Sequence, residues 1–334
     1  MNHMLSIVVT ALLLSVSLLQ ATSHSSSIDH ILKNGSRDGL KIEANVAFTE
    51  GPAWHAPSRS VFFTDVLNNR IMRRVSDGSL HVYRNPSNRA NGLAFDHDDR
   101  LLACESEGKR ITRTERNGSI TVLTANYQGH AYNSPNDLTV DSKGRIYFTD
   151  PRYGSREGME ILDDQGTPVE GVYRIDLDGS VTQILAHEIH RPNGIAISKD
   201  QQFLFVADNA SGQPLGNRKL WRFEMKPDGS VNKESRKELF DWRSSLGIDR
   251  GPDGMTVGRD GDLYVTAGWN FHDAPVQTPR KFKAGIYVID PSGKGLVRFI
   301  PIPLDDITNC TFGGDDGNTL FITAGQRLLS IPVD

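Results

Sequence analysis

Cysteine is nearly absent from this chain, which has two cysteines, Cys104 and Cys310, in 334 residues. At most one disulfide could form, so the fold cannot depend on a disulfide framework even in an oxidising compartment. We expect both residues to be buried free thiols.

An excess of one charge is also missing. The chain has 37 Lys and Arg residues against 41 Asp and Glu residues, a formal net charge of −4, and neither sign forms blocks. This balance excludes a basic surface for nucleic acid and favours a small or uncharged substrate. No stretch sustains the 3.6-residue period of an amphipathic helix. Because 31 glycines and 16 prolines indicate many short elements joined by turns, the composition favours an all-β fold.

One long apolar run stands near the start of the sequence. Residues 5–19 are almost continuously apolar, and no Lys, Arg, Asp or Glu occurs before Asp29. The run is short for a bilayer span, and Ala21 and Ser23 form a small-x-small cleavage site. We therefore predict a signal peptide over residues 1–23 and a polar leader over residues 24–39. The mature protein would be periplasmic or secreted, with no stable membrane insertion after cleavage.

One sequence unit recurs six times along the rest of the chain. Each copy begins with a polar residue, and a glycine usually follows it. An apolar residue, a turn with Asp or Gly, and an apolar strand come next. The copies start 41 to 60 residues apart, a spacing typical of four-stranded propeller blades with loop insertions. Pairs such as Asp178-Gly179 are hairpin signals between the later strands. The units start at Glu50, Asn91, Asn136, Asn193, Asp253 and Asn309.

The ends of the repeat region predict how the ring closes. The sixth unit contains three strands, whereas residues 40–46 form an extra strand before the first unit. We expect this strand to complete the sixth blade, which would remove the last exposed sheet edge. The sequence thus predicts one six-bladed β-propeller over residues 40–334. Two stacked three-blade domains would expose extra edges and are disfavoured.

The first residues of the six units are predicted to meet at the propeller axis, because the innermost strand of every blade faces the central channel. This column contains two acids and four amides, and no Lys, Arg, His or Cys. Such groups suit Ca²⁺, which takes about six to eight oxygen ligands, better than Zn²⁺, which prefers nitrogen and sulfur. Glu50 and Asp253 would repel one another without a cation between them. We predict one divalent cation, first of all Ca²⁺, with Mg²⁺, Mn²⁺ or Zn²⁺ as alternatives.

Four motifs around these residues resemble the gluconolactonase and regucalcin (senescence marker protein) family. The resemblance spans about residues 45–334 and is closest to the bacterial gluconolactonases, through residues 101–105, 146–154 and 311–314. Two positions depart from the family. Ser134 stands where regucalcin-type members have Arg, and Ser106 stands where the bacterial branch often has His. The four motifs are Thr49-Glu-Gly-Pro-Ala-Trp54, Asn133-Ser-Pro-Asn-Asp-Leu138, Arg191-Pro-Asn-Gly-Ile-Ala196 and Gly251-Pro-Asp-Gly-Met255.

The resemblance implies a cation held by Glu50, Asn193 and Asp253, with Asn136 as a further ligand or substrate contact. It also implies Asp253 as the catalytic acid or base. The candidate substrate contacts are Asn136, Asn91, Glu105, Arg152 and Tyr153.

The implied reaction is hydrolysis of a sugar lactone or a similar small ester. The cation would act as a Lewis acid on the carbonyl oxygen, and Asp253 would deprotonate or orient the attacking water. Two alternatives stay open at this point. One is a phosphotriesterase or fluorophosphatase that uses the same ion on a phosphoryl oxygen. The other is a non-catalytic propeller in which Ca²⁺ is structural or recruits a ligand.

Overall fold

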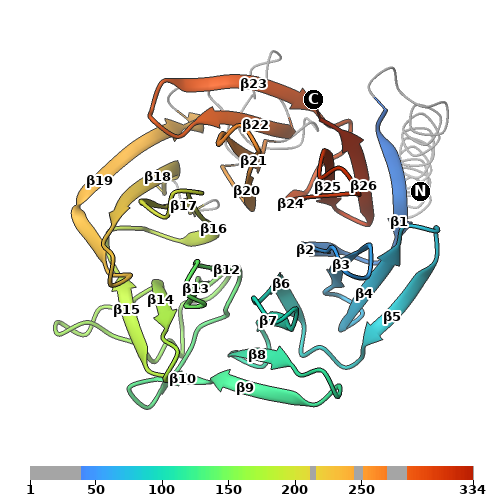
Figure 1. Cartoon of the computed structure of the whole chain (residues 1–334). Coiled ribbons are helices and arrows are strands. Elements are labelled where there is room, and N and C mark those ends of the chain that lie inside the picture. Colours follow the sequence, from blue (N-terminus) through green and yellow to red (C-terminus); the bar gives the residue numbers. More distant parts are fainter. Residues whose placement is uncertain (1–38, 211–215, 244–250, 269–283, 334) are drawn as a thin grey trace, which may run out of the picture.

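The computed structural model describes residues 39–210, 216–243, 251–268 and 284–333. In these residues, six four-stranded sheets surround a central axis, and the chain runs around the ring from blue to red (Figure 1). This is the predicted six-bladed β-propeller. The predicted signal peptide, and the leader up to residue 38, lie outside the described residues. No helix in the described ranges is both long enough and apolar enough to cross a membrane.

The first three blades each begin with their innermost strand and continue outward. Blade one contains β2 (Thr49–His55), β3 (Ser60–Asp65), β4 (Arg70–Val75) and β5 (Leu80–Arg84). Blade two contains β6 (Ala90–Phe95), β7 (Leu101–Glu105), β8 (Arg110–Thr114) and β9 (Ile120–Thr124). Blade three contains β12 (Leu138–Val140), β13 (Ile146–Asp150), β14 (Gly171–Ile175) and β15 (Val181–Leu185). A short hairpin, β10 (Asn126–Tyr127) with β11 (His130–Ala131), precedes blade three.

The last three blades follow the same order, except that the outermost strand of blade six comes from the start of the described chain. Blade four contains β16 (Pro192–Ile197), β17 (Phe203–Asn209), β18 (Arg218–Met225) and β19 (Val231–Asp241). Blade five contains β20 (Met255–Val257), β21 (Leu263–Ala267), β22 (Gly285–Asp290) and β23 (Gly295–Pro301). Blade six contains β24 (Ile307–Gly313), β25 (Thr319–Ala324), β26 (Arg327–Pro332) and β1 (Lys41–Asn45).

The ring closes through β1, as the sequence predicts. β1 pairs antiparallel with β26, with Lys41 opposite Ser330 and Ile42 opposite Leu329. Ala44 of β1 is buried against the neighbouring strands. The pairing covers the outer edge of β26 and leaves the sixth sheet with four strands like the others.

The hydrophobic core lies between adjacent blades. One cluster joins Tyr147 and Val172 of blade three to Leu204 and Phe223 of blade four, all of them fully buried. Similar clusters join the other neighbouring sheets, so each blade is stabilised by apolar burial on both of its faces. Both cysteines are buried and free, as expected.

Tight turns and buried aspartates fix the strands within a blade. Gly179, in the turn between β14 and β15, has a φ of 84°, a conformation that residues with a Cβ atom rarely adopt. Three fully buried aspartates end second strands and accept hydrogen bonds from backbone N–H groups of the segment that enters the inner strand. They hold the approach to the axis in place. The sets are Asp65 with Ala47 and Phe48, Asp150 with Asn133 and Ser134, and Asp208 with His190 and Arg191.

Candidate active site at the propeller axis

Five of the six predicted column residues stand at equivalent positions, and the sixth does not. In blades three to six, the residue opposite the second-strand position that Phe148, Val206, Val265 and Ile322 share lies two positions after the column residue. In blade six this residue is Cys310, so the column position belongs to Thr308. The predicted placement of Asn309 is therefore wrong by one residue. The β24–β25 hairpin has an additional residue pair, Gly313 with Thr319. This pair increases the number of residues between the column position and the second strand.

Four column residues that carry an acid or an amide are almost completely buried, with exposures between 4% and 8%. They come from blades one, three, four and five, whose inner strands surround the axis (Figure 1). Asn91, in blade two, is partly exposed. The buried four are Glu50, Asn136, Asn193 and Asp253.

Hydrogen bonds join each blade to the next around the whole ring. At five junctions, a backbone N–H group or a threonine hydroxyl of one blade donates to the carbonyl oxygen of the next blade's column residue. At the sixth junction the Thr308 hydroxyl donates to the carbonyl oxygen of Thr49, over 3.0 Å. The donor and acceptor residues at the first five junctions are Thr64 and Asn91, Gly92 and Asn136, Thr149 and Asn193, Gly194 and Asp253, and Gly254 and Thr308, at 2.7 to 3.0 Å.

The residue after the column is a glycine in four blades because the next blade comes very close. A Cβ atom at Gly51 would lie 2.1 Å from the carbonyl oxygen of Asn91, and one at Gly194 would lie 2.3 Å from that of Asp253. Blades three and six, which lie on opposite sides of the ring, carry side chains at this position. These residues are Asp137 and Asn309.

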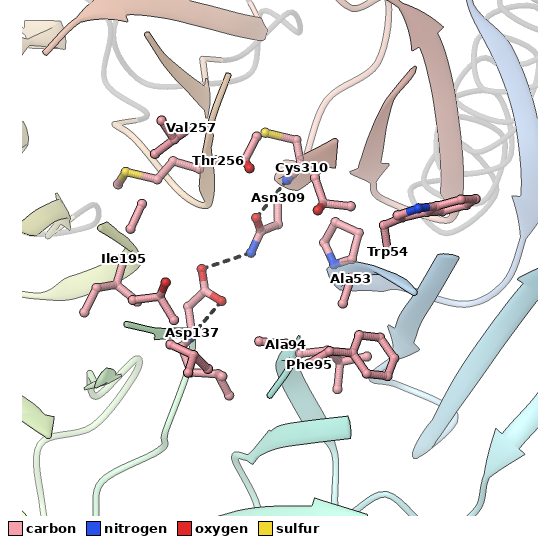
Figure 2. A pocket seen from close by; sticks show the side chains of 18 of the residues that line it. Ala53, Trp54, Ala94, Phe95, Asp137, Ile195, Thr256, Val257, Asn309 and Cys310 are labelled. Atoms are coloured by element: carbon pink, nitrogen blue, oxygen red, sulfur yellow. Dashed lines mark hydrogen bonds between the residues drawn. The ribbon is translucent and has the colours of Figure 1, made fainter. Parts of the chain in front are cut away.

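Asp137 and Asn309 meet in the channel. The Asn309 Nδ2 group donates to Oδ2 of Asp137 over 3.1 Å, and the backbone N–H of Leu138 donates to Oδ1 over 2.9 Å (Figure 2). Both side chains line a cavity of about 400 Å³ together with residues such as Trp54 and Phe95. Burial raises the pKa of Asp137 to about 7, and the negative charge of Asp253 contributes in the same direction. Sequence reasoning missed Asp137, although its departure from glycine was a visible signal.

Tyr153 reaches the column, as a substrate contact would have to. The Asn193 Nδ2 group donates to the Tyr153 hydroxyl over 2.5 Å. Desolvation of the hydroxyl group raises the pKa of Tyr153, although the residue as a whole is 42% exposed, and the negative charge of Asp253 raises it further. Tyr153, Asn193 and Asp253 therefore belong to one site. The guanidinium of Arg152 donates to the carbonyl oxygen of Ser155 over 2.8 Å, so its substrate role stays a prediction.

Glu105 does not fit its predicted role as a substrate contact. Its side chain is fully buried, and its oxygens accept hydrogen bonds from Arg84, Arg110, Asn88 and Thr112. Arg110 and Thr112 belong to blade two, Arg84 ends β5 of blade one, and Asn88 lies in the segment between the two blades. Glu105 therefore acts as a structural anion at the end of β7, in the place where other blades have an aspartate.

The donor set at the axis fits a hard cation. Glu50 and Asp253 offer carboxylate oxygens, and Asn136 and Asn193 offer amide oxygens. The described part of the chain contains no group of three or more His, Cys, Asp and Glu side chains that could hold a metal. A cation at the axis would thus depend on the amide oxygens as well as on the two carboxylates.

The six blades define a propeller in which two acids and two amides are buried at the starts of four inner strands. Residues 48–326 match the SMP-30/Gluconolactonase/LRE-like region, and the chain belongs to this family. The membership confirms the resemblance seen in the four column motifs.

Several relatives match over most of their length. A gluconolactonase from Zymomonas mobilis is 28% identical over 309 residues, which cover 87% of this chain and 80% of the relative. A pentonolactonase from Haloferax volcanii is 24% identical over 289 residues, covering 84% and 83%. The solved structure of a gluconolactonase from Xanthomonas campestris has a TM-score of 0.71 at 31% identity, with coverage of 88% and 89%.

Replacing Glu105 by Gln tests the structural assignment of this residue. We expect the free energy of unfolding to fall by about 3 kcal/mol, because two arginines lose a buried counter-charge. The KM for a substrate should not change. The matched control is Glu107→Gln, since Glu107 is exposed and pairs with Arg89 over 3.4 Å at the surface. Urea denaturation and steady-state kinetics measure both effects, and a raised KM with unchanged stability would restore the substrate role.

Proposed function

We propose that this protein is a hydrolase that opens a sugar lactone, a cyclic carboxylic ester. The observation that carries the proposal is the buried set of two carboxylates and two amides at the starts of four inner strands. Membership of the family supports it, as do the gluconolactonase and pentonolactonase relatives. Hexonolactones and pentonolactones are therefore the first substrates to test.

In this proposal, Glu50, Asn136, Asn193 and Asp253 hold one divalent cation. When bound, the cation supplies Lewis-acid polarisation of the lactone carbonyl and a positive charge opposite the developing oxyanion. Ca²⁺ is favoured because every donor is an oxygen, and Mg²⁺ and Mn²⁺ accept the same kind of ligand. Zn²⁺ is disfavoured, since the column contains no His or Cys.

The chain's own part in the reaction falls mainly to Asp253. Its carboxylate takes a proton from the attacking water while the water oxygen forms a bond to the carbonyl carbon. The bond between this carbon and the ring oxygen then breaks, and the proton passes to the ring oxygen to give the open hydroxy acid. Asn136 and Asn91 orient the hydroxyl groups of the sugar, together with Arg152 and Tyr153 from residues 151–170.

We also propose that the protein is exported, on the basis of the apolar run over residues 5–19 and the small residues Ala21 and Ser23. Expression of the full chain should give a mature protein that begins at residue 24. N-terminal sequencing of protein from the periplasm or the medium measures this, and a mutated chain with charges in the apolar run is the control. An uncleaved N-terminus inside the cell would contradict the proposal.

Removal of divalent cations should abolish lactone hydrolysis. Acid release from a γ- or δ-lactone is followed before chelation, after chelation, and after Ca²⁺, Mg²⁺, Mn²⁺ or Zn²⁺ is restored singly. We expect loss of activity on chelation and the best recovery with Ca²⁺, because the donors are oxygens. An aryl phosphotriester assayed in parallel tests the phosphotriesterase alternative. Full activity after chelation would show that the cation has no part in the reaction.

Replacing Asp253 by Asn separates the base from the ligand. We expect kcat to fall about 10²- to 10⁴-fold, the usual contribution of a general base, while the remaining oxygen donors retain weakened Ca²⁺ binding. Asp164→Asn, at an exposed position, is the control. Steady-state kinetics at saturating Ca²⁺ and calorimetric titration measure the two effects. A kcat within threefold of the unmodified protein would remove Asp253 from the role of base.

A further inference from the structure

The side-chain amide of Asn193 has two unlike ends, and only one of them can bind a cation. Its oxygen is a ligand for hard cations, whereas its NH₂ group is a hydrogen-bond donor and repels them. In this structure the NH₂ group donates to the Tyr153 hydroxyl over 2.5 Å. The amide oxygen is thereby left as the group that a cation could use.

We propose that Tyr153 is a positioning residue that fixes the orientation of the Asn193 amide and so raises the affinity of the axis for a divalent cation. The inference rests on the cation site of the proposed function and adds to it a residue that does not touch the cation. Groups that hydrogen-bond to a metal ligand commonly set its orientation and its strength as a ligand.

Arg191 holds the ring of Tyr153 in place. The guanidinium carbon of Arg191 lies 5.0 Å from the centre of the Tyr153 ring, within the range of a cation–π contact. Arg191 and Asn193 are separated by Pro192 alone, at the start of β16. The same strand start therefore presents the amide and supports the tyrosine that binds it. Arg191 is itself fixed, because its backbone N–H donates to Asp208 over 2.9 Å.

Glu170 connects this strand start to the segment that carries Tyr153. Its carboxylate accepts hydrogen bonds from Nε of Arg191 over 2.9 Å and from the backbone N–H of Arg152 over 2.7 Å. The guanidinium of Arg156 also donates to it. The side chains of Glu170 and Arg191 are 1% and 6% exposed, so solvent and salt weaken the attraction between their charges very little. Glu170 thus ties both ends of residues 151–170 to blade four, with Tyr153 directed at Asn193.

The test measures cation affinity rather than activity alone. Tyr153→Phe removes the hydroxyl and keeps the ring, so the Ca²⁺ dissociation constant should rise about tenfold or more, as expected for loss of a partner of a metal ligand. Tyr173→Phe is the matched control in the same blade. The Tyr173 hydroxyl accepts a hydrogen bond of 2.9 Å from the Gln183 amide, which is not a column residue. Its Ca²⁺ affinity should not change. Calorimetric titration of Ca²⁺ into chelator-treated protein gives both constants.

Two further measurements distinguish positioning from packing. An aspartate at position 193 has two equivalent oxygens and needs no orientation, so Tyr153→Phe in an Asn193→Asp background should change the dissociation constant less than about twofold. In the single variant, saturating Ca²⁺ should recover the part of kcat that is lost through weaker cation binding, whereas a lost sugar contact would raise KM at every Ca²⁺ concentration. An equal effect of Tyr153→Phe in both backgrounds would overturn the inference, as would a raised KM with unchanged Ca²⁺ affinity.

The outcome also separates this inference from the proposed function. If the unmodified protein binds Ca²⁺ and Tyr153→Phe binds it equally well, the positioning role is wrong and the cation site stands. If the unmodified protein binds no divalent cation, both are wrong.

Discussion

The hydrogen bonds that join each blade to the column of the next blade determine how the groups at the axis are arranged. The column carbonyl oxygens of five blades accept these hydrogen bonds, so these backbone oxygens already have a role in joining the blades. Side chains are then the groups that the column can direct into the channel. The close approach also requires glycine next to the column in most blades, and this clears the space in which Asp137 and Asn309 meet.

The buried acids of the axis explain why a cation suits this channel. Glu50, Asp137 and Asp253 are each at most 8% exposed, and an isolated buried carboxylate costs several kcal/mol even after local relaxation. Asp137 shows this cost directly, since burial raises its pKa to about 7. Glu105 shows the other solution, in which arginines from two neighbouring blades pair with a buried acid. No Arg or Lys stands in the column itself, so a bound cation would add positive charge beside these acids.

The sequence predicted the architecture well because the propeller repeats one pattern. Six units, the hairpin at Gly179 and the strand over residues 40–46 are local signals that survive in the structure. The site was predicted less completely. Asn309 was assigned to the column by aligning the sixth sequence unit with the others, whereas an additional pair in the hairpin gives that position to Thr308. Glu105 was named as a substrate contact with the motif over residues 101–105, and its arginine partners come from other strands that no local motif identifies. The link from Tyr153 through Arg191 to Glu170 crosses two blades, so residue spacing alone could not reveal it.

The strand exchange in blade six has a consequence for how the protein reaches its final form. β1 and β26 come from opposite ends of the described chain, so their sheet cannot be completed until almost all of the polypeptide has been synthesised. Pairing between such distant segments is slow, because the entropy of closing the intervening loop is lost before the contacts form. Until then, β1 lacks its partner strand and can pair with any other extended chain. An interrupted copy of this protein would therefore not be a smaller propeller, but an open sheet prone to aggregate.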